Sequence, residues 1–143
     1  MIKSKQIKRY AIPLLCGISF FILMRYVFFF GYVPTDSMAP TILAKSYVFG
    51  TRIYDNPQKG DIIVFDYEGA ALVKRIVALP GETVYIDDKP QEKFRDFDVV
   101  RVMTVPENNY YVLGDNAEHS IDSRVWTDPF ISGDRIIAKL WRK

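Results

Sequence analysis

The sequence predicts a mainly β protein with one membrane-type helix at its N-terminus. Residues 10–30 form a nearly continuous apolar stretch, which is long enough for such a helix. From residue 47 onward, short runs rich in β-branched and aromatic residues alternate with turn residues, as they do in β-sheet domains. Beyond residue 34, no segment longer than about ten residues follows a helical period. We therefore expect a compact β-sheet domain, residues 31–143, behind a single helix.

The stretch 10–30 matches a membrane span in length. Its roughly 21 residues, at ~1.5 Å per residue, reach ~31 Å, about the thickness of one hydrocarbon core. Arg25 is its charged residue, and it lies near the outer end, where a long side chain can extend to the interface. A shorter span ending near Met24 is the alternative. The aromatic residues at this end resemble the belts that mark membrane interfaces: Tyr26, Phe28, Phe29, Phe30 and Tyr32.

Basic residues precede the apolar stretch, at Lys3, Lys5, Lys8 and Arg9. The positive-inside rule therefore places residues 1–9 in the cytoplasm and the domain after the span on the extracytoplasmic face. A cleavable secretory signal is the rival interpretation. Because the stretch is long for the core of a signal and no small-x-small site follows it, we expect an uncleaved, single-pass anchor.

Turn residues divide the rest of the chain into β-rich runs. The runs predicted as strands are 47–54, 61–67, 71–79, 83–86, 99–105, 110–114 and 135–141. The charged segment 91–98 is expected to be an exposed loop or hairpin tip.

Composition excludes several kinds of site. The net charge of +2 gives no clear cationic excess for nucleic-acid binding. The single cysteine, Cys16, lies in the apolar stretch, so neither an internal disulfide nor a cysteine-based zinc site is expected. The single histidine, His119, excludes a metal site built on two histidines but leaves a Ser–His–Asp triad open. We expect no metal and no cofactor.

Three short segments carry residues that could take part in chemistry, and the first is 34–41, Pro-Thr-Asp-Ser-Met-Ala-Pro-Thr. Its serine, Ser37, is a candidate nucleophile. The chain from the end of the span to Ser37 reaches at most ~23–25 Å when extended, so Ser37 must lie close to the membrane surface. Taken alone, a serine between two prolines is also an ordinary polar turn.

The second segment is 72–81, Leu-Val-Lys-Arg-Ile-Val-Ala-Leu-Pro-Gly, which places a lysine inside an apolar strand. Strand alternation puts Lys74 and Arg75 on opposite faces, so one of them shares a face with bulky aliphatic residues. One interpretation is an edge strand whose cations extend into water. The other is a desolvated amine. Burial lowers the pKa of a lysine from ~10.4 toward the ~7–8 that a general base for a serine hydroxyl needs.

The third segment is 114–124, Gly-Asp-Asn-Ala-Glu-His-Ser-Ile-Asp-Ser-Arg. It combines turn formers, hydroxyls, acids and an arginine. A loop held together by hydrogen bonds and Asp–Arg pairs is a sufficient interpretation of this segment alone.

In this order, the three segments resemble those of the bacterial type I signal peptidases. The likeness lies in Ser-Met-x-Pro-Thr after a membrane span, Lys-Arg-Ile-Val-x-Leu-Pro-Gly, and Gly-Asp-Asn-x₃-Ser-x-Asp-Ser-Arg, and it extends over nearly the whole chain. The resemblance implies a signal-peptidase-like β-sheet catalytic domain at the bacterial inner membrane. It also implies a serine endopeptidase with a Ser/Lys dyad that cleaves signal peptides from exported preproteins, without a metal.

The resemblance further implies a role for each matching residue. Ser37 would be the nucleophile and Lys74 the general base. Thr35, together with the backbone N–H of Ser37, would stabilise the oxyanion, and Ser120 would orient Lys74. The positions expected to hold the site together are Arg75, Asp115, Asp122 and Arg124.

The sequence departs from the commonest pattern of that family at two points. Residues 117–119, Ala-Glu-His, replace a run of Arg-Asp/Asn-Asn, and the stretch between Gly81 and Gly114 is too short for the extra β domain of some members. The chain therefore resembles a minimal member. Peptidases that process conjugative pilins also look similar and are the alternative. We expect a monomer whose partners are the preprotein and the lipid bilayer, with no nucleic acid.

Other hypotheses compete with this one. A self-cleaving repressor of the SOS type also uses serine and lysine on a β scaffold, but such proteins are soluble and linked to DNA. A catalytically silent, membrane-tethered β module that binds partners would have no reason to keep Ser37, Lys74 and Ser120 together. A triad built on His119 would leave Lys74 without a role.

Overall fold

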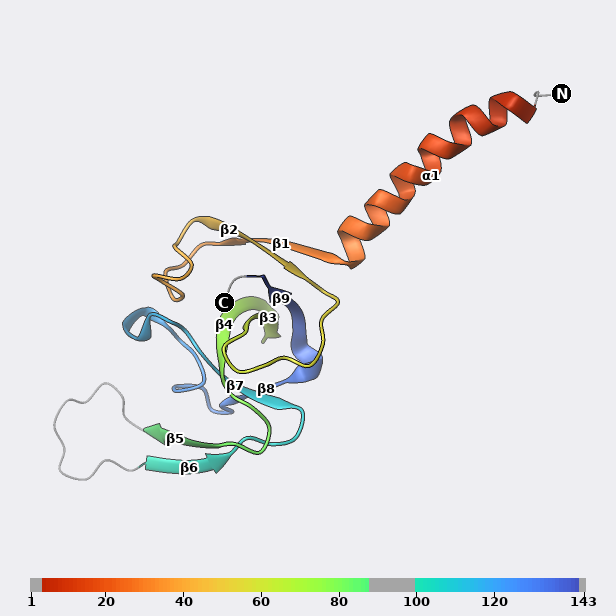
Figure 1. The fold of residues 1–143 in the computed structure, drawn as a ribbon. Helices are drawn as coiled ribbons and strands as arrows, with labels where there is room; N and C mark the ends of the chain where they lie inside the picture. The colour runs from red at the N-terminus through yellow and green to blue at the C-terminus, as the bar shows by residue number, and fades with distance from the viewer. Residues whose placement is uncertain (1–3, 88–99, 142–143) are drawn as a thin grey trace.

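The computed structural model describes residues 4–87 and 100–141, which form one helix followed by an antiparallel β domain (Figure 1). The helix is α1 (Ser4–Tyr26). The strands are β1 (Phe28–Val33), β2 (Ser46–Thr51), β3 (Ile62–Tyr67), β4 (Ala70–Ala78), β5 (Thr83–Asp87), β6 (Val100–Thr104), β7 (Asn109–Leu113), β8 (Phe130–Ser132) and β9 (Ile136–Leu140). Two short 3-10 turns are η1 (Ala117–His119) and η2 (Gly133–Arg135).

These elements confirm the mainly β fold with one N-terminal helix. Every run predicted as a strand overlaps an observed strand, while β1 and β8 were not predicted. The expected loop at 91–98 lies outside the described residues. In Figure 1, α1 projects away from the β domain. Its segment Arg9–Tyr26 is long and apolar enough to cross a membrane.

The end of the helix differs from the expected boundary at residue 30. The helix ends at Tyr26, and Phe28 already begins β1, so the β domain starts at residue 28 rather than 31. The reason is long-range pairing, because β1 runs antiparallel to β2 with Phe28 opposite Thr51. Aromatic residues also suit a pleated strand. The observed end lies closer to the shorter span ending near Met24 than to residue 30.

Seven strands form one sheet in the order β1-β2-β9-β3-β4-β7-β8, and β5 pairs with β6 in a separate two-stranded sheet. All pairings are antiparallel. Figure 1 shows the large sheet curling round so that β1 and β2 lie over β9, β3 and β4. Strand β3 runs through the middle, where residues 62–65 are buried on both faces. Apolar clusters therefore lie on both faces of β3, one with Ile62 and Val64 and the other with Ile63 and Phe65, and a third cluster packs against β5 and β6.

Two features of this fold position the chemistry-bearing segments. Along β4, Lys74, Ile76 and Ala78 are buried whereas Arg75 is half-buried, so the lysine is the cation that shares a face with apolar residues. The loop after β1 is fixed by Met38 and Ile42, both fully buried in the core between the first strands and β9. Buried apolar residues thus anchor both the strand and the loop in the core.

Candidate active site

Ser37 lies in a turn of the loop that joins β1 to β2. Its neighbour Met38 is completely buried in the core, and this burial anchors the turn. The carbonyl of Ser37 accepts a hydrogen bond of 3.0 Å from the backbone N–H of Asn116, in the loop after β7. Ser37 is only 8% exposed. The backbone of the candidate nucleophile is therefore held on both sides by neighbouring parts of the fold.

Lys74 projects from β4 into the same region and is 4% exposed. Its Nζ donates a hydrogen bond of 2.9 Å to Ser120 Oγ. Burial lowers the pKa of Lys74, because the charged amine loses its hydration. The Asp122 carboxylate acts in the opposite direction and raises this pKa, and Arg124 lowers it. The net direction is toward the neutral amine, which is the form that can accept a proton.

Ser37, Lys74 and Thr35 line one cleft of about 280 Å³. Its walls come from the end of β1, the first half of β4 and the loop after β7: Tyr32, Val33, Pro34, Ala71, Leu72, Val73, His119 and Ile121. Among the described residues, the amine of Lys74 is hydrogen-bonded to Ser120 rather than to Ser37. The cleft is mostly apolar, so a substrate entering it would displace water from around the amine.

Behind Lys74, a chain of hydrogen bonds runs from Ser120 to Asp122 and Arg124. Ser120 Oγ donates to Asp122 Oδ2 at 2.6 Å, and the Arg124 guanidinium reaches the two carboxylate oxygens at 2.8 and 2.6 Å. The backbone N–H of Gly114 adds a bond of 2.8 Å. Burial alone would raise the pKa of Asp122, but these hydrogen bonds hold it below its usual value. The carboxylate is thus a stable, charged anchor for the Ser120 hydroxyl.

A second ion pair lies on the opposite face of β4. The Arg75 guanidinium donates to both carboxylate oxygens of Asp115, at 2.8 and 2.7 Å, and to the carbonyl of Gly60 at 2.8 Å. The bidentate bond from Arg75 lowers the pKa of Asp115. Arg75 and Asp115 therefore do not reach the cleft but join β4 to the loop after β7, which carries Ser120.

His119 also lines the cleft, but its side chain contacts Asp36 and Asn116 rather than a serine. Its Nδ1 lies 3.0 Å from Asp36 Oδ2. The geometry thus gives no support to a triad in which His119 activates Ser37.

Two residues of the site received no role from the sequence, Gly114 and Asn116. A Cβ on Gly114 would collide with Ser120 Oγ and with the carbonyl of Ser37, so the two segments approach each other only because this residue is glycine. Asn116 donates from its backbone to Ser37 and from its side chain to the carbonyl of Asp36, at 3.2 Å. The sequence does contain the Gly-Asp-Asn motif, whose glycine and asparagine indicate a turn. The motif does not indicate which other segment of the chain this turn contacts.

A serine on a fixed turn and a buried lysine, facing one cleft of an antiparallel β scaffold, are the parts of a Ser/Lys hydrolase. The family described as "Signal peptidase, peptidase S26" matches residues 6–90 and 87–141. These ranges take in most of the chain, and the chain belongs to that family.

Curated relatives carry the same description. The chain is 36% identical over 122 residues to the probable signal peptidase I-1 of Synechocystis sp., covering 66% of this chain and 61% of that protein. It is 32% identical over 148 residues to signal peptidase I S of Bacillus subtilis, covering 85% and 80%. With signal peptidase I of Pseudomonas aeruginosa the identity is 28% over 160 residues, covering 71% and 56%. The chain thus spans 61% and 56% of the first and third relatives.

Among solved structures, a signal peptidase I from Enterococcus faecalis is 28% identical, with a TM-score of 0.45 over 59% of this chain and 96% of that one.

The close packing around Gly114 predicts that Gly114→Ala is poorly tolerated. The added methyl group has no space beside Ser120 and Ser37, and overpacking of this kind costs about 1–3 kcal/mol of stability. Urea unfolding of the detergent-solubilised protein measures the change. Gly17→Ala is the matched control, because nothing lies within 4 Å of a Cβ at that position. Equal stability of the Gly114→Ala variant and the unsubstituted protein would contradict this account of the packing.

Proposed function

We propose that the protein is a membrane-anchored serine endopeptidase that cleaves signal peptides from exported preproteins, with Ser37 as nucleophile and Lys74 as general base. The observation that carries this proposal is the burial of Lys74 in the cleft that Ser37 lines. A buried amine is biased toward the neutral form, and only a neutral amine can activate a hydroxyl. Membership of the signal peptidase family supports the same substrate class.

In the first half of the reaction, Ser37 Oγ attacks the scissile carbonyl carbon while Lys74 Nζ takes the hydroxyl proton. The negative charge that develops on the carbonyl oxygen is stabilised by the backbone N–H of Ser37 and the hydroxyl of Thr35. When the C–N bond breaks, Lys74 gives its proton to the leaving amine. The signal peptide remains bound to Ser37 as an ester.

In the second half, a water molecule enters and Lys74 accepts one of its protons. The hydroxide attacks the ester carbonyl through the same oxyanion site. The bond to Ser37 Oγ then breaks, and Lys74 returns the proton to the serine. No other group needs to carry a proton in this cycle, so the sequence of steps requires only one titrating side chain.

Ser120 has a positioning role in this scheme. Its hydroxyl donates to Asp122, so its lone pairs face the Lys74 amine and hold Nζ at 2.9 Å. The Asp122–Arg124 pair fixes the direction of that donation. The hydrogen bond restricts the rotation of the Lys74 amine, and we propose that it directs the amine lone pair toward the cleft that Ser37 lines.

The substrate is proposed to bind as an extended strand beside β4. Within the described residues, the pairing of β4 with β7 covers only the second half of β4, from Arg75 onward. Residues 71–73 line the cleft, and only their β3 side carries a ladder partner. A peptide can add to such an edge through main-chain hydrogen bonds, with alternate side chains entering pockets. The family resemblance implies small residues at the first and third positions before the cut.

The membrane placement is part of the proposal. Helix α1 spans the bilayer with its basic N-terminus in the cytoplasm, and β1 begins directly after it. The outward face of the first two strands and the end of β9 carries exposed aromatic residues: Phe30, Tyr32, Tyr47, Phe49 and Trp141. Phe30 stacks on Tyr47 with ring centroids 5.2 Å apart. We propose that this aromatic face lies in the lipid interface and keeps the cleft at the membrane surface, where signal peptides emerge.

Removal of either proposed dyad member should abolish cleavage. Ser37→Ala removes the nucleophile and Lys74→Ala removes the base. Lys74→Arg should also be inactive, because a guanidinium does not lose its proton in this pH range. The measurement is the appearance of clipped product from one preprotein in detergent, with Lys59→Ala, a surface lysine paired with Glu82, as control. Normal turnover by the Lys74→Ala enzyme would rule out the dyad.

The lowered pKa of Lys74 sets the expected pH dependence. The neutral amine is the active form, so kcat/KM should rise with pH and be lost as pH falls through the pKa of Lys74. Because burial lowers this pKa, the midpoint should lie below the ~10.4 of an unperturbed lysine. A pH series of kcat/KM on one peptide substrate measures the midpoint. A profile with its midpoint at or above the ordinary lysine value would contradict the proposal.

The aromatic face can be tested through tryptophan fluorescence, since the chain has two tryptophans in different settings. Trp141 is 63% exposed on this face, while Trp126 is 7% exposed in the core. Phospholipids brominated in their acyl chains should quench Trp141 when the protein is reconstituted, because bromine quenches only at close range. Trp141→Phe should abolish most of the quenching, and Trp126→Phe should preserve it. Quenching of Trp141 by aqueous acrylamide but not by the lipids would contradict the membrane placement.

A further inference from the structure

Two residues that the proposed mechanism does not use, Asp36 and His119, meet at the rim of the cleft. The His119 Nδ1 lies 3.0 Å from Asp36 Oδ2. Asp36 directly precedes Ser37, and His119 directly precedes Ser120. The pair therefore joins the two chain segments that carry the two hydroxyl groups of the site.

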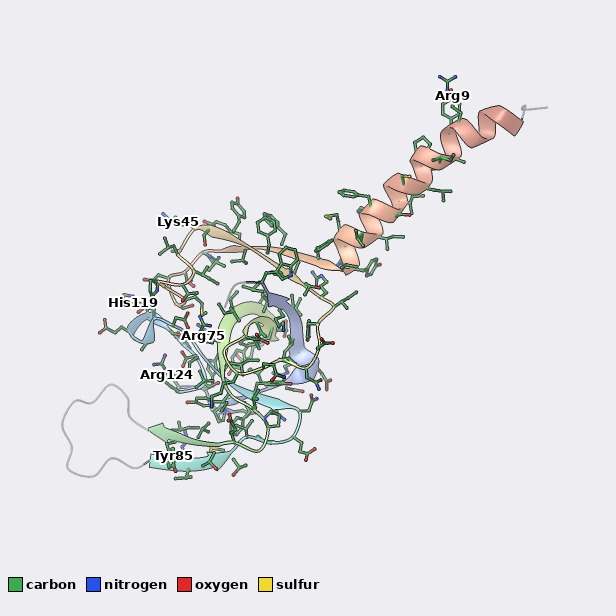
Figure 2. The ribbon with its side chains drawn as sticks, in the orientation of Figure 1. Arg9, Lys45, Arg75, Tyr85, His119 and Arg124 are labelled. Atoms are coloured by element: carbon green, nitrogen blue, oxygen red, sulfur yellow. The ribbon has the colours of Figure 1, made fainter. Side chains whose placement is uncertain are left out.

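We propose that His119 is a positioning residue whose side-chain bridge to Asp36 holds the Ser37 turn against the Ser120 loop. The inference rests on the proposed function, because it assigns a cause to the placement of the proposed nucleophile. Figure 2 shows His119 at the outer edge of the β domain, on the η1 turn. Figure 1 shows that turn close to the loop between β1 and β2.

The other contacts of the Ser37 turn lie on its inner side. Met38 anchors it in the core, and Asn116 binds the backbone carbonyls of Ser37 and Asp36. These contacts fix the main chain of the turn against the core and against the loop after β7. The side chain of Asp36 points outward, and its bridge to His119 closes the turn on that outer side. Loss of the bridge would leave the residue before the nucleophile held only through its carbonyl.

The bridge depends on which ring nitrogen of His119 carries hydrogen. With hydrogen on Nδ1, the ring donates to the Asp36 carboxylate; without it, Nδ1 can accept from Asn116 Nδ2, which lies 3.2 Å away. Only the first arrangement joins the two segments directly. An asparagine at position 119 offers an N–H near the place of Nδ1, whereas a leucine offers none.

Stability and activity should respond differently to loss of the bridge. Both side chains are largely exposed, at 61% and 51%, and exposed ion pairs contribute little to global stability. A nucleophile displaced by about 1 Å, however, can lose ~10²-fold in rate. A partial displacement of the Ser37 turn should therefore lower kcat by roughly 10-fold with little change in KM, since the proposed peptide-binding edge, residues 71–73 of β4, is unchanged.

The kinetic test uses the full chain in detergent with one preprotein substrate. His119→Leu should lower kcat with KM preserved, and His119→Asn should restore most of the loss. Glu118→Gln, an exposed neighbour on the same turn, is the matched control and should behave like the unsubstituted enzyme. Asp36→Ala combined with His119→Leu should be no slower than the more impaired single variant. Additive losses, or unchanged kcat in His119→Leu, would overturn the proposal.

A second measurement does not depend on turnover. Amide hydrogen exchange of a peptide covering residues 35–38 should be faster in His119→Leu than in the unsubstituted protein, and unchanged in Glu118→Gln. Equal exchange in His119→Leu overturns the bridge, whatever the activity. If the unsubstituted protein cleaves no preprotein, the proposed function fails, and the exchange experiment still decides whether His119 holds the turn.

Discussion

The burial of one cation, Lys74, is the constraint on which the rest of the site depends. An ammonium group removed from water is costly unless it is paired or loses its proton. Lys74 makes no ion pair within the described residues; its amine meets a neutral hydroxyl, that of Ser120. The Asp122 carboxylate, which raises the pKa of Lys74, is already bound by Arg124 and by the Gly114 N–H, so its charge is largely compensated. Within the described residues, Lys74 therefore has no ion-pair partner that would keep its amine protonated.

The scaffold brings three distant segments together by separate anchors rather than through the polar site itself. Lys74 is placed by the alternation of β4, and the Ser37 turn by the burial of Met38 in the core. The loop that carries Ser120 is tied back to β7 by Ser123, whose hydroxyl and backbone both bond to Val112. Because each anchor is apolar or hydrogen-bonded within the fold, the side chains of Ser37 and Lys74, proposed as the dyad, face the cleft without also having to hold the fold together.

Much of this arrangement could be predicted from the sequence, because the three segments matched a known family in order and spacing. Strand alternation established that Lys74 and Arg75 face opposite ways, but only the packing of β4 reveals that Lys74 takes the buried face. The end of α1 was set too late, because Phe28 to Phe30 are as apolar as the helix before them and only their pairing with β2 makes them a strand. The role of Gly114 and the contact between Asp36 and His119 depend on distances between separate segments, which no local pattern contains.

The central claim is that Lys74 is held in a site that favours its neutral form. Its most direct test is a titration of the Lys74 side chain by NMR, with ¹³C and ¹⁵N labels on lysine and Lys74→Arg for assignment. We expect the resonance of Lys74 to titrate below ~10.4, the value of an unperturbed lysine. A pKa at or above this ordinary value would mean that the buried amine stays protonated, and it would contradict the proposed role of Lys74 as a general base.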